Sequence, residues 1–138
     1  AFRQTGFQGN SDSFNGVARF KYYGEILDPQ LTNLMIFTGG AGYKPSRRSS
    51  LDLVYHYYLR DFSSTSIPRS GLNNVGQTGT DKHLGEEIDL IIGYQEIAQV
   101  DTRLIFGLFL PGKAFDEPVR AGARDPAFSA SILIRYTF

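Results

Sequence analysis

The amino-acid sequence predicts an all-β fold: an antiparallel transmembrane β-barrel segment of about six long strands, incomplete on its own. Three observations support this fold class. Apolar and polar residues alternate along six stretches that are separated by turn residues. The stretches exceed the ordinary strand of about 5–6 residues and suit the roughly 9–11 residues of a tilted membrane strand. Tyr and Phe supply all of the 14% aromatic content, as in the aromatic girdles of membrane barrels.

The alternating stretches follow one another along the chain after a short lead-in. They cover residues 16–27, 31–43, 50–62, 84–97, 102–110 and 128–138. We expect residues 1–15 to form a periplasmic-side lead-in and residues 16–138 to form six antiparallel strands of a single domain, 1–138. No stretch approaches the roughly 18 consecutive apolar residues of a membrane helix. Membrane insertion is therefore predicted for the strands alone.

The connections between the stretches fall into two length classes. Long polar connections span 63–83 and 111–127, whereas 44–49 and 98–101 are short. Outer-membrane barrels place short turns on the periplasmic side and long loops outside. With a periplasmic C-terminus, both long loops fall outside and both of these short turns fall in the periplasm. The short turn at 28–30 is the exception, because it falls on the outer side.

Each stretch predicts two distinct faces, because successive side chains of a strand point to opposite sides. In the last stretch the apolar face comprises Phe128, Ala130, Ile132, Ile134, Tyr136 and Phe138. Its other face comprises Ser129, Ser131, Leu133, Arg135 and Thr137. Stretches 16–27, 50–62, 84–97 and 102–110 repeat this design, whereas the register of 31–43 stays open because neither of its faces is polar. We expect the apolar faces to meet lipid and the polar faces to line a lumen.

A soluble β-sandwich is the alternative, because each of its strands also buries one face. Three features favour the membrane barrel. The strands are too long for a sandwich, and the apolar face extends to Phe138, where soluble strands normally fray. Tyrosines also lie near the strand ends, as in an interfacial girdle; they are Tyr22, Tyr43, Tyr94 and Tyr136.

Charged side chains gather on the predicted lumen faces. The basic residues are Arg19, Lys21, Arg60, Arg103 and Arg135, and the acidic residues are Glu25, Asp52, Glu87 and Asp89. Arg and Lys there could contact a carboxylated sugar chain, Arg through bidentate hydrogen bonds. The alternative is a structural network in which acids such as Glu87 and Asp89 pair with arginines of neighbouring strands. Five basic against four acidic residues do not decide between the two.

Composition and spacing argue against several other classes of function. The 14 basic and 14 acidic side chains give no net charge, which argues against a nucleic-acid-binding protein. Cysteine is absent, so neither disulfides nor thiol chemistry is expected. The two histidines, His56 and His83, show no spacing typical of a catalytic triad, and the sequence has no phosphate loop or metal-ligand spacing. We therefore expect no enzyme activity, no cofactor and no metal site.

The end of the sequence resembles the C-terminal recognition signal of bacterial outer-membrane proteins. The resemblance rests on Phe138 in last place, Tyr136 two residues before it, and the aliphatic Ile134 and Ile132. It implies that the barrel-assembly machinery is a partner, that Phe138, Tyr136 and Ile134 act as the assembly signal, and that the chain lies in the lipid bilayer of the bacterial outer membrane.

A second resemblance covers most of the chain. Five segments, at 3–10, 19–34, 42–58, 84–94 and 106–115, resemble in order the C-terminal part of the alginate-export family of outer-membrane porins. The resemblance implies an outer-membrane barrel whose basic lumen passes an anionic polysaccharide such as alginate.

Members of that family are several times longer than this chain. Six strands cannot close a barrel, because the smallest single-chain bacterial barrels have about eight. We therefore expect the remaining strands to come from a missing N-terminal part or from other chains. A structural or scaffold β-barrel element within a larger outer-membrane assembly is the alternative function.

Overall fold

The computed structural model describes residues 11–12, 16–28, 34–61, 81–115 and 125–138. Within these ranges the protein is all-β, apart from one short 3-10 helix, η1 (Lys113–Phe115). The long strands are β3 (Leu34–Ser46), β4 (Ser49–Arg60), β5 (His83–Tyr94), β6 (Val100–Pro111) and β7 (Ala127–Tyr136). Two short strands, β1 (Ser11–Asp12) and β2 (Phe20–Lys21), pair with each other. Across the described residues, no helix is long and apolar enough to cross a membrane.

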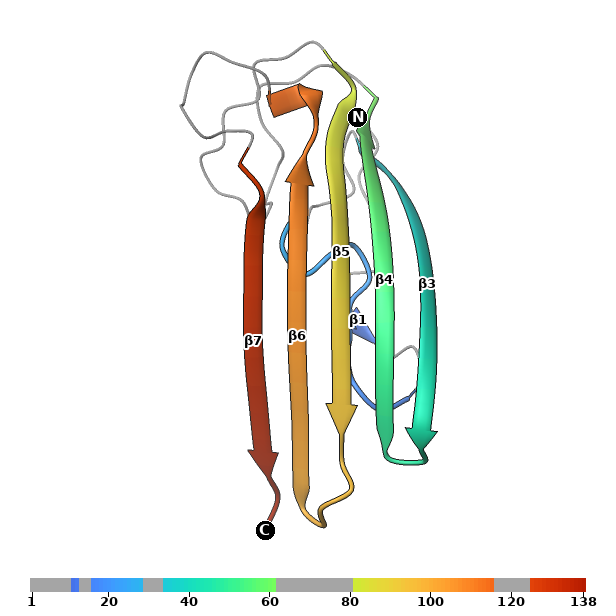
Figure 1. Ribbon diagram of the computed structural model, residues 1–138, viewed down its shortest axis with the longest axis vertical. Helices are drawn as coiled ribbons and strands as arrows, with labels where there is room; N and C mark the ends of the chain where they lie inside the picture. Colours follow the sequence, from blue (N-terminus) through green and yellow to red (C-terminus); the bar gives the residue numbers. More distant parts are fainter. Residues whose placement is uncertain (1–10, 13–15, 29–33, 62–80, 116–124) are drawn as a thin grey trace.

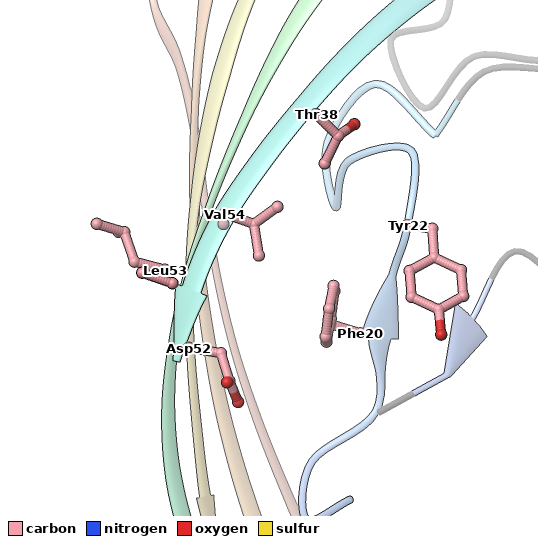
Figure 2. Close-up of a pocket in the computed structure, with 8 residues that line it drawn as sticks. Phe20, Tyr22, Thr38, Asp52, Leu53 and Val54 are labelled. Carbon is pink, nitrogen blue, oxygen red and sulfur yellow. The ribbon is translucent and has the colours of Figure 1, made fainter. Parts of the chain in front are cut away.

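The long strands form one five-stranded antiparallel sheet in chain order, β3-β4-β5-β6-β7. They lie side by side along the long axis of the molecule, and residues 16–28 lie against one face (Figure 1). Figure 2 shows that β3 bends toward this covered side, where Asp52 and Val54 point, while Leu53 points away. The fold class is therefore confirmed: the chain forms a long, curved antiparallel sheet of the kind that makes part of a barrel wall.

Strand register fixes which residues share a face, because directly opposed residues in an antiparallel pair point the same way. His56 of β4 lies opposite Thr38 of β3 and Glu87 of β5, and Glu87 lies opposite Phe109 of β6. We call the face that carries these four residues the inner face and the opposite one the outer face. This register settles the faces of β3, which the sequence left open.

The outer face is apolar over the whole sheet. Its side chains are Met35, Phe37, Ala41, Tyr43, Leu51, Leu53, Tyr55, Tyr57, Leu59, Glu86, Ile88, Leu90, Ile92, Tyr94, Thr102, Leu104, Phe106, Leu108, Leu110, Phe128, Ala130, Ile132, Ile134 and Tyr136. Only Glu86 carries a charge. Most of the large side chains are exposed and the others are half-buried, with Phe37 60% and Ile132 69% accessible. The faces predicted for stretches 50–62, 84–97, 102–110 and 128–138 are thus confirmed.

The connections after β4 and β6 and the two short turns leave from opposite ends of the sheet. Leu59 lies opposite His83 and Gly85 lies opposite Pro111, so the connections after β4 and β6 start at one end. The β3–β4 and β5–β6 turns lie at the other end (Figure 1). Residues 62–80 and 116–124, which make up most of the two predicted long loops, lie outside the described residues.

The interpretation of residues 16–27 as a wall strand is corrected by the structure. Only Phe20–Lys21 is a strand there, so this stretch is not one of the five long strands that the described part of the wall contains. Positive φ angles at Gly16 (75°), Gly24 (101°) and Asp28 (35°) break the extended conformation. Ala18, Phe20 and Ile26, which produced the alternation, are buried against the inner face instead of facing lipid. Alternation shows that one side is buried but not what covers it.

The two short turns are joined by hydrogen bonds. The Glu96 carboxylate accepts bonds from the hydroxyls of Ser46 and Ser49, which flank the β3–β4 turn. The backbone N–H of Gln95 donates to the carbonyl of Arg48 at 2.8 Å. The Ser46 and Ser49 hydroxyls hold the pKa of Glu96 below its ordinary value of 4.5. This link therefore favours the ionised carboxylate.

We predict that Glu96→Gln lowers the thermal unfolding temperature slightly at neutral pH and removes one acid-dependent component of stability. A carboxyl whose folded-state pKa is depressed stabilises the fold above its ordinary value of 4.5 and loses that contribution as pH falls through the folded value. Circular dichroism melts in detergent at neutral and acid pH would measure the difference. If acidification lowers the melting temperatures of the native protein and of Glu96→Gln by the same amount, the prediction is wrong.

Candidate functional site

The inner face is covered by residues 16–28, which we call the inner segment. It crosses the inner face of the sheet at the level of β4, β5 and β6 (Figure 1). At one end, Ala18 and Phe20 pack with Val54 and Ile91. At the other end, the segment joins a second apolar cluster, which comprises Ile26, Leu27, Tyr58, Leu84, Phe109, Ala114 and Phe115. Burial of each large apolar side chain stabilises by about 1.5–3 kcal/mol, so two apolar contacts hold the segment on the wall.

Between these clusters, two carboxylates of β5 hold the backbone of the inner segment. Glu87 accepts hydrogen bonds from the N–H groups of Ile26 (2.6 Å) and Leu27 (3.0 Å). Asp89 accepts one from the N–H of Glu25 at 3.1 Å. Glu87 and Asp89 lie two residues apart on one strand, so both point inward, and both are fully buried. We call this pair the carboxylate clamp.

Neighbouring polar side chains complete the clamp. The Tyr58 hydroxyl lies 3.1 Å from Glu87 Oε2 and 2.8 Å from the Tyr23 carbonyl oxygen, and its single proton serves one acceptor at a time. His56 Nε2 lies 3.6 Å from Asp89 Oδ2. The other ring nitrogen, Nδ1, lies 2.9 Å from the Thr38 hydroxyl. The clamp is thus bonded to both the wall and the segment.

Three glycines allow the segment to approach the wall closely. A Cβ on Gly24 would meet the Tyr58 hydroxyl and come within 2.6 Å of Glu87 Oε2. On the wall, a Cβ on Gly93 would lie 2.8 Å from the Cβ of Ala18, and one on Gly107 would lie 3.0 Å from Ile26 Cγ1 of the segment. Side chains at these positions would push the segment away from the sheet.

The predicted lumen residues do not form one site. Glu87 and Asp89 lie together on the inner face, under the inner segment. Arg60 is only 2% exposed, and its Nε donates to the Asp81 carbonyl at 2.8 Å. Arg19 and Lys21 lie on the inner segment rather than on the wall, and Lys21 pairs with Asp28 at 2.9 Å. Arg103 and Arg135 lie on the inner face of β6 and β7.

The expected pairing of Glu87 and Asp89 with arginines of adjacent strands is not observed. Among the described residues neither carboxylate lies in an ion pair with Arg, and backbone N–H groups occupy them instead. Sequence reasoning placed His56 and Tyr58 on the polar face but gave them no role. It did not find Gly24, because only the contact with the segment makes a small residue necessary there.

On the inner side, Arg19, Arg103 and Arg135 lie in no ion pair within the described part of the chain. Arg19 and Arg135 are exposed, and Arg103 is half-buried, with its Nε lacking a hydrogen-bond partner. Arg135 lies opposite Asp101 in the register, but the Asp101 carboxylate accepts a hydrogen bond from Gln95 Nε2 at 3.1 Å. These three arginines are therefore at least partly accessible on this side, whereas Asp52, Glu87 and Asp89 are buried.

The predicted assembly-signal residues lie at the end of β7. Ile134 and Tyr136 are on the outer face, 67% and 53% exposed. Phe138 follows the strand, and its ring meets that of Tyr136 edge-on, with 5.0 Å between the centroids. These three residues are the aromatic and aliphatic end of the outer face.

An apolar outer face, a polar inner face and long antiparallel strands define the class of protein as a β-barrel wall. Residues 1–126 match the family described as "Alginate export", and the chain belongs to this family. It is 30% identical over 135 aligned residues to "Alginate production protein AlgE" of Azotobacter vinelandii. The alignment covers 83% of this chain and 28% of that relative, so the chain spans well under a third of the relative's length.

We predict that Gly93→Ala lowers the free energy of unfolding by about 1–3 kcal/mol, because the added methyl group overpacks the contact with Ala18. Gly39→Ala is the matched control, since a Cβ on Gly39 of β3 meets nothing within 4 Å. Urea titrations of both variants folded in detergent micelles would measure the effect. Equal stability of the two variants would contradict a close approach of the segment at Gly93.

Proposed function

We propose that this chain forms part of the wall of an outer-membrane export conduit that passes an anionic polysaccharide, with alginate as the cargo. Membership of the alginate-export family supports the class of cargo. The observation that carries the proposal is the separation of charges on the inner side. Glu87 and Asp89 of the wall are buried under the inner segment, whereas Arg19, Arg103 and Arg135, which lie in no ion pair among the described residues, remain at least partly accessible.

Placement in the outer membrane is supported by the outer face. β4, β5 and β6 each have 12 residues, enough for a tilted strand that needs about 9–11 to cross a bilayer. An apolar face this large on a water-soluble monomer would be an aggregation surface. Glu86 is the one charged residue on it, next to the end of the sheet where β5 begins, and charges near the interface cost little.

Anion preference follows from which charges a cargo can touch. Glu87 and Asp89 have no exposed surface, and backbone donors occupy both oxygens of Glu87 and Oδ2 of Asp89. Arg103 and Arg135 lie on the inner face, and Arg19 projects from the segment. Guanidinium groups bind carboxylates through two parallel hydrogen bonds, so they can hold uronate groups in passing. The near balance of acids and bases in the sequence therefore does not apply to the accessible surface.

Passage, rather than catalysis, is the proposed activity. Thr38, His56 and Asp89 follow the order hydroxyl, imidazole, carboxylate, which is also the order of a catalytic triad. However, His56 Nε2 and Asp89 Oδ2 are 3.6 Å apart, longer than a hydrogen bond, and both side chains are buried. The group thus lacks the hydrogen bond between imidazole and carboxylate on which a triad depends. Thr38→Ala should therefore leave transport of the polymer intact.

We predict that Arg103→Glu combined with Arg135→Glu weakens or reverses the anion preference of the native protein in planar bilayers. The change replaces two accessible cations of the inner face with anions, which should attract cations and repel uronate polymer. Reversal potentials in a salt gradient, with and without added polymer, would measure it.

The matched control is Arg47→Glu with Arg48→Glu, which makes the same charge change in the β3–β4 turn. Its selectivity should change less. Unchanged selectivity in the inner-face variant would mean that Arg103 and Arg135 have a structural role. Native protein that shows no conductance at all would favour the scaffold function.

The open edges of the sheet lead to a separate prediction about the assembly. Among the described strands, β3 and β7 each have a neighbour on one side only. An unpaired strand edge in lipid costs several kcal/mol for each unsatisfied backbone group. We predict that both edges pair with further strands, supplied by the rest of the protein or by other chains.

Native mass spectrometry of the protein in detergent would test this pairing. The expected mass is well above the 15.4 kDa of this sequence. A 15.4 kDa monomer with an intact sheet would contradict it.

A further inference from the structure

We infer that the inner segment is a fixed constriction of the conduit and that Glu87 and Asp89 are the positioning residues that hold it there. This inference rests on the proposed function, because it assigns a width and a charge to the same passage. Cargo cannot reach the two buried acids, so their role is to hold the segment.

The segment lies along much of the height of the wall. Near the short turns, the Val17 carbonyl accepts a hydrogen bond from Gln95 Nε2 at 3.1 Å. Toward the other end of the sheet, Leu27 packs in the cluster that contains Leu84 and Phe115. Gln95 follows the last residue of β5 and Leu84 is near its first, so the segment extends over most of that strand. The segment therefore narrows the passage along this height.

The clamp supplies the hydrogen-bond acceptors that the backbone of the segment would otherwise lack. Residues 25–27 belong to no strand, so the three N–H groups that point to the wall lack ladder partners. An unpaired backbone donor shielded from water costs about 1–3 kcal/mol. Carboxylates are stronger acceptors than neutral groups, and Glu87 and Asp89 satisfy all three donors. The clamp thus fixes this corner of the segment at one place on β5.

The same arrangement links the width of the passage to its charge. With the segment in place, Arg19 is presented and the two acids are covered. Displacement of the segment would widen the passage and uncover Glu87 and Asp89, which repel an anionic polymer. Two ways of releasing the segment should therefore differ in their effect on anion preference. Gly24→Val releases it and leaves the acids, whereas Glu87→Ala with Asp89→Ala releases it and removes them.

Cysteine accessibility tests the position of the segment without any need for conduction. The chain has no native cysteine, so single cysteines can be labelled alone. Val17 is 8% exposed, whereas Arg19, two residues along, is exposed. In the native protein, Val17→Cys should react with a membrane-impermeant maleimide at least about tenfold more slowly than Arg19→Cys, as expected if reaction requires local opening. Equal rates would overturn the inference, whether or not the protein conducts.

The clamp variant tests the positioning role. In the background of Glu87→Ala with Asp89→Ala, the two labelling rates should converge and single-channel conductance should rise while anion preference persists. Gly24→Val should raise conductance and reduce anion preference. Glu86→Ala, which removes a neighbouring acid from the outer face, is the matched control and should change neither quantity.

Two outcomes separate failure of the inference from failure of the proposed function. Protection of Val17→Cys that survives removal of both carboxylates would overturn the role of the clamp, even in a protein that passes alginate. A protected segment in a protein that never conducts would instead reject the conduit. If the double variant does not assemble, Gly24→Val and the labelling of the native protein still decide the matter.

Discussion

The geometry of the inner side depends on hydrogen bonds between two carboxylates of β5 and three consecutive backbone N–H groups of the inner segment. A chain that lies on a sheet without joining it must find acceptors for its N–H groups among side chains. Glu87 and Asp89 supply them, and the apolar contacts at Phe20 and Leu27 then fix the two ends. Without the segment, the inner face of the wall would expose Glu87 and Asp89; with the segment in place, these acids are buried and Arg19 is exposed beside them.

Much of the sheet could be predicted from the sequence. The period-two pattern gave the four strands β4 to β7 with their faces, because the apolar outer face is continuous and uninterrupted by glycine or proline along each of them. It left β3 open, since Leu34 and Ile36 on the inner side are apolar too. These residues pack against the apolar cluster around Leu27 rather than lining a polar lumen.

The inner segment could not be predicted from the same pattern. Ala18, Phe20 and Ile26 alternate with charged residues as a membrane strand would, and burial against protein or lipid leaves the same signature. Gly16 and Gly24 were the available signals, because glycine is common where φ is positive. The clamp could not be predicted because its partners lie far apart in the sequence. Leu27 donates to Glu87, which is 60 positions away. Charge counts along single strands contain no such information.

The bonds from Ser46 and Ser49 to Glu96 have a consequence for how the chain can change in evolution. Surface turns ordinarily tolerate insertions and deletions independently of one another. Here the β3–β4 turn and the β5–β6 turn share one carboxylate, so a residue added to either turn would separate the hydroxyls from Glu96. The lengths of the two turns are thereby coupled. Relatives that lengthen one turn should also alter the other or lose the acidic residue.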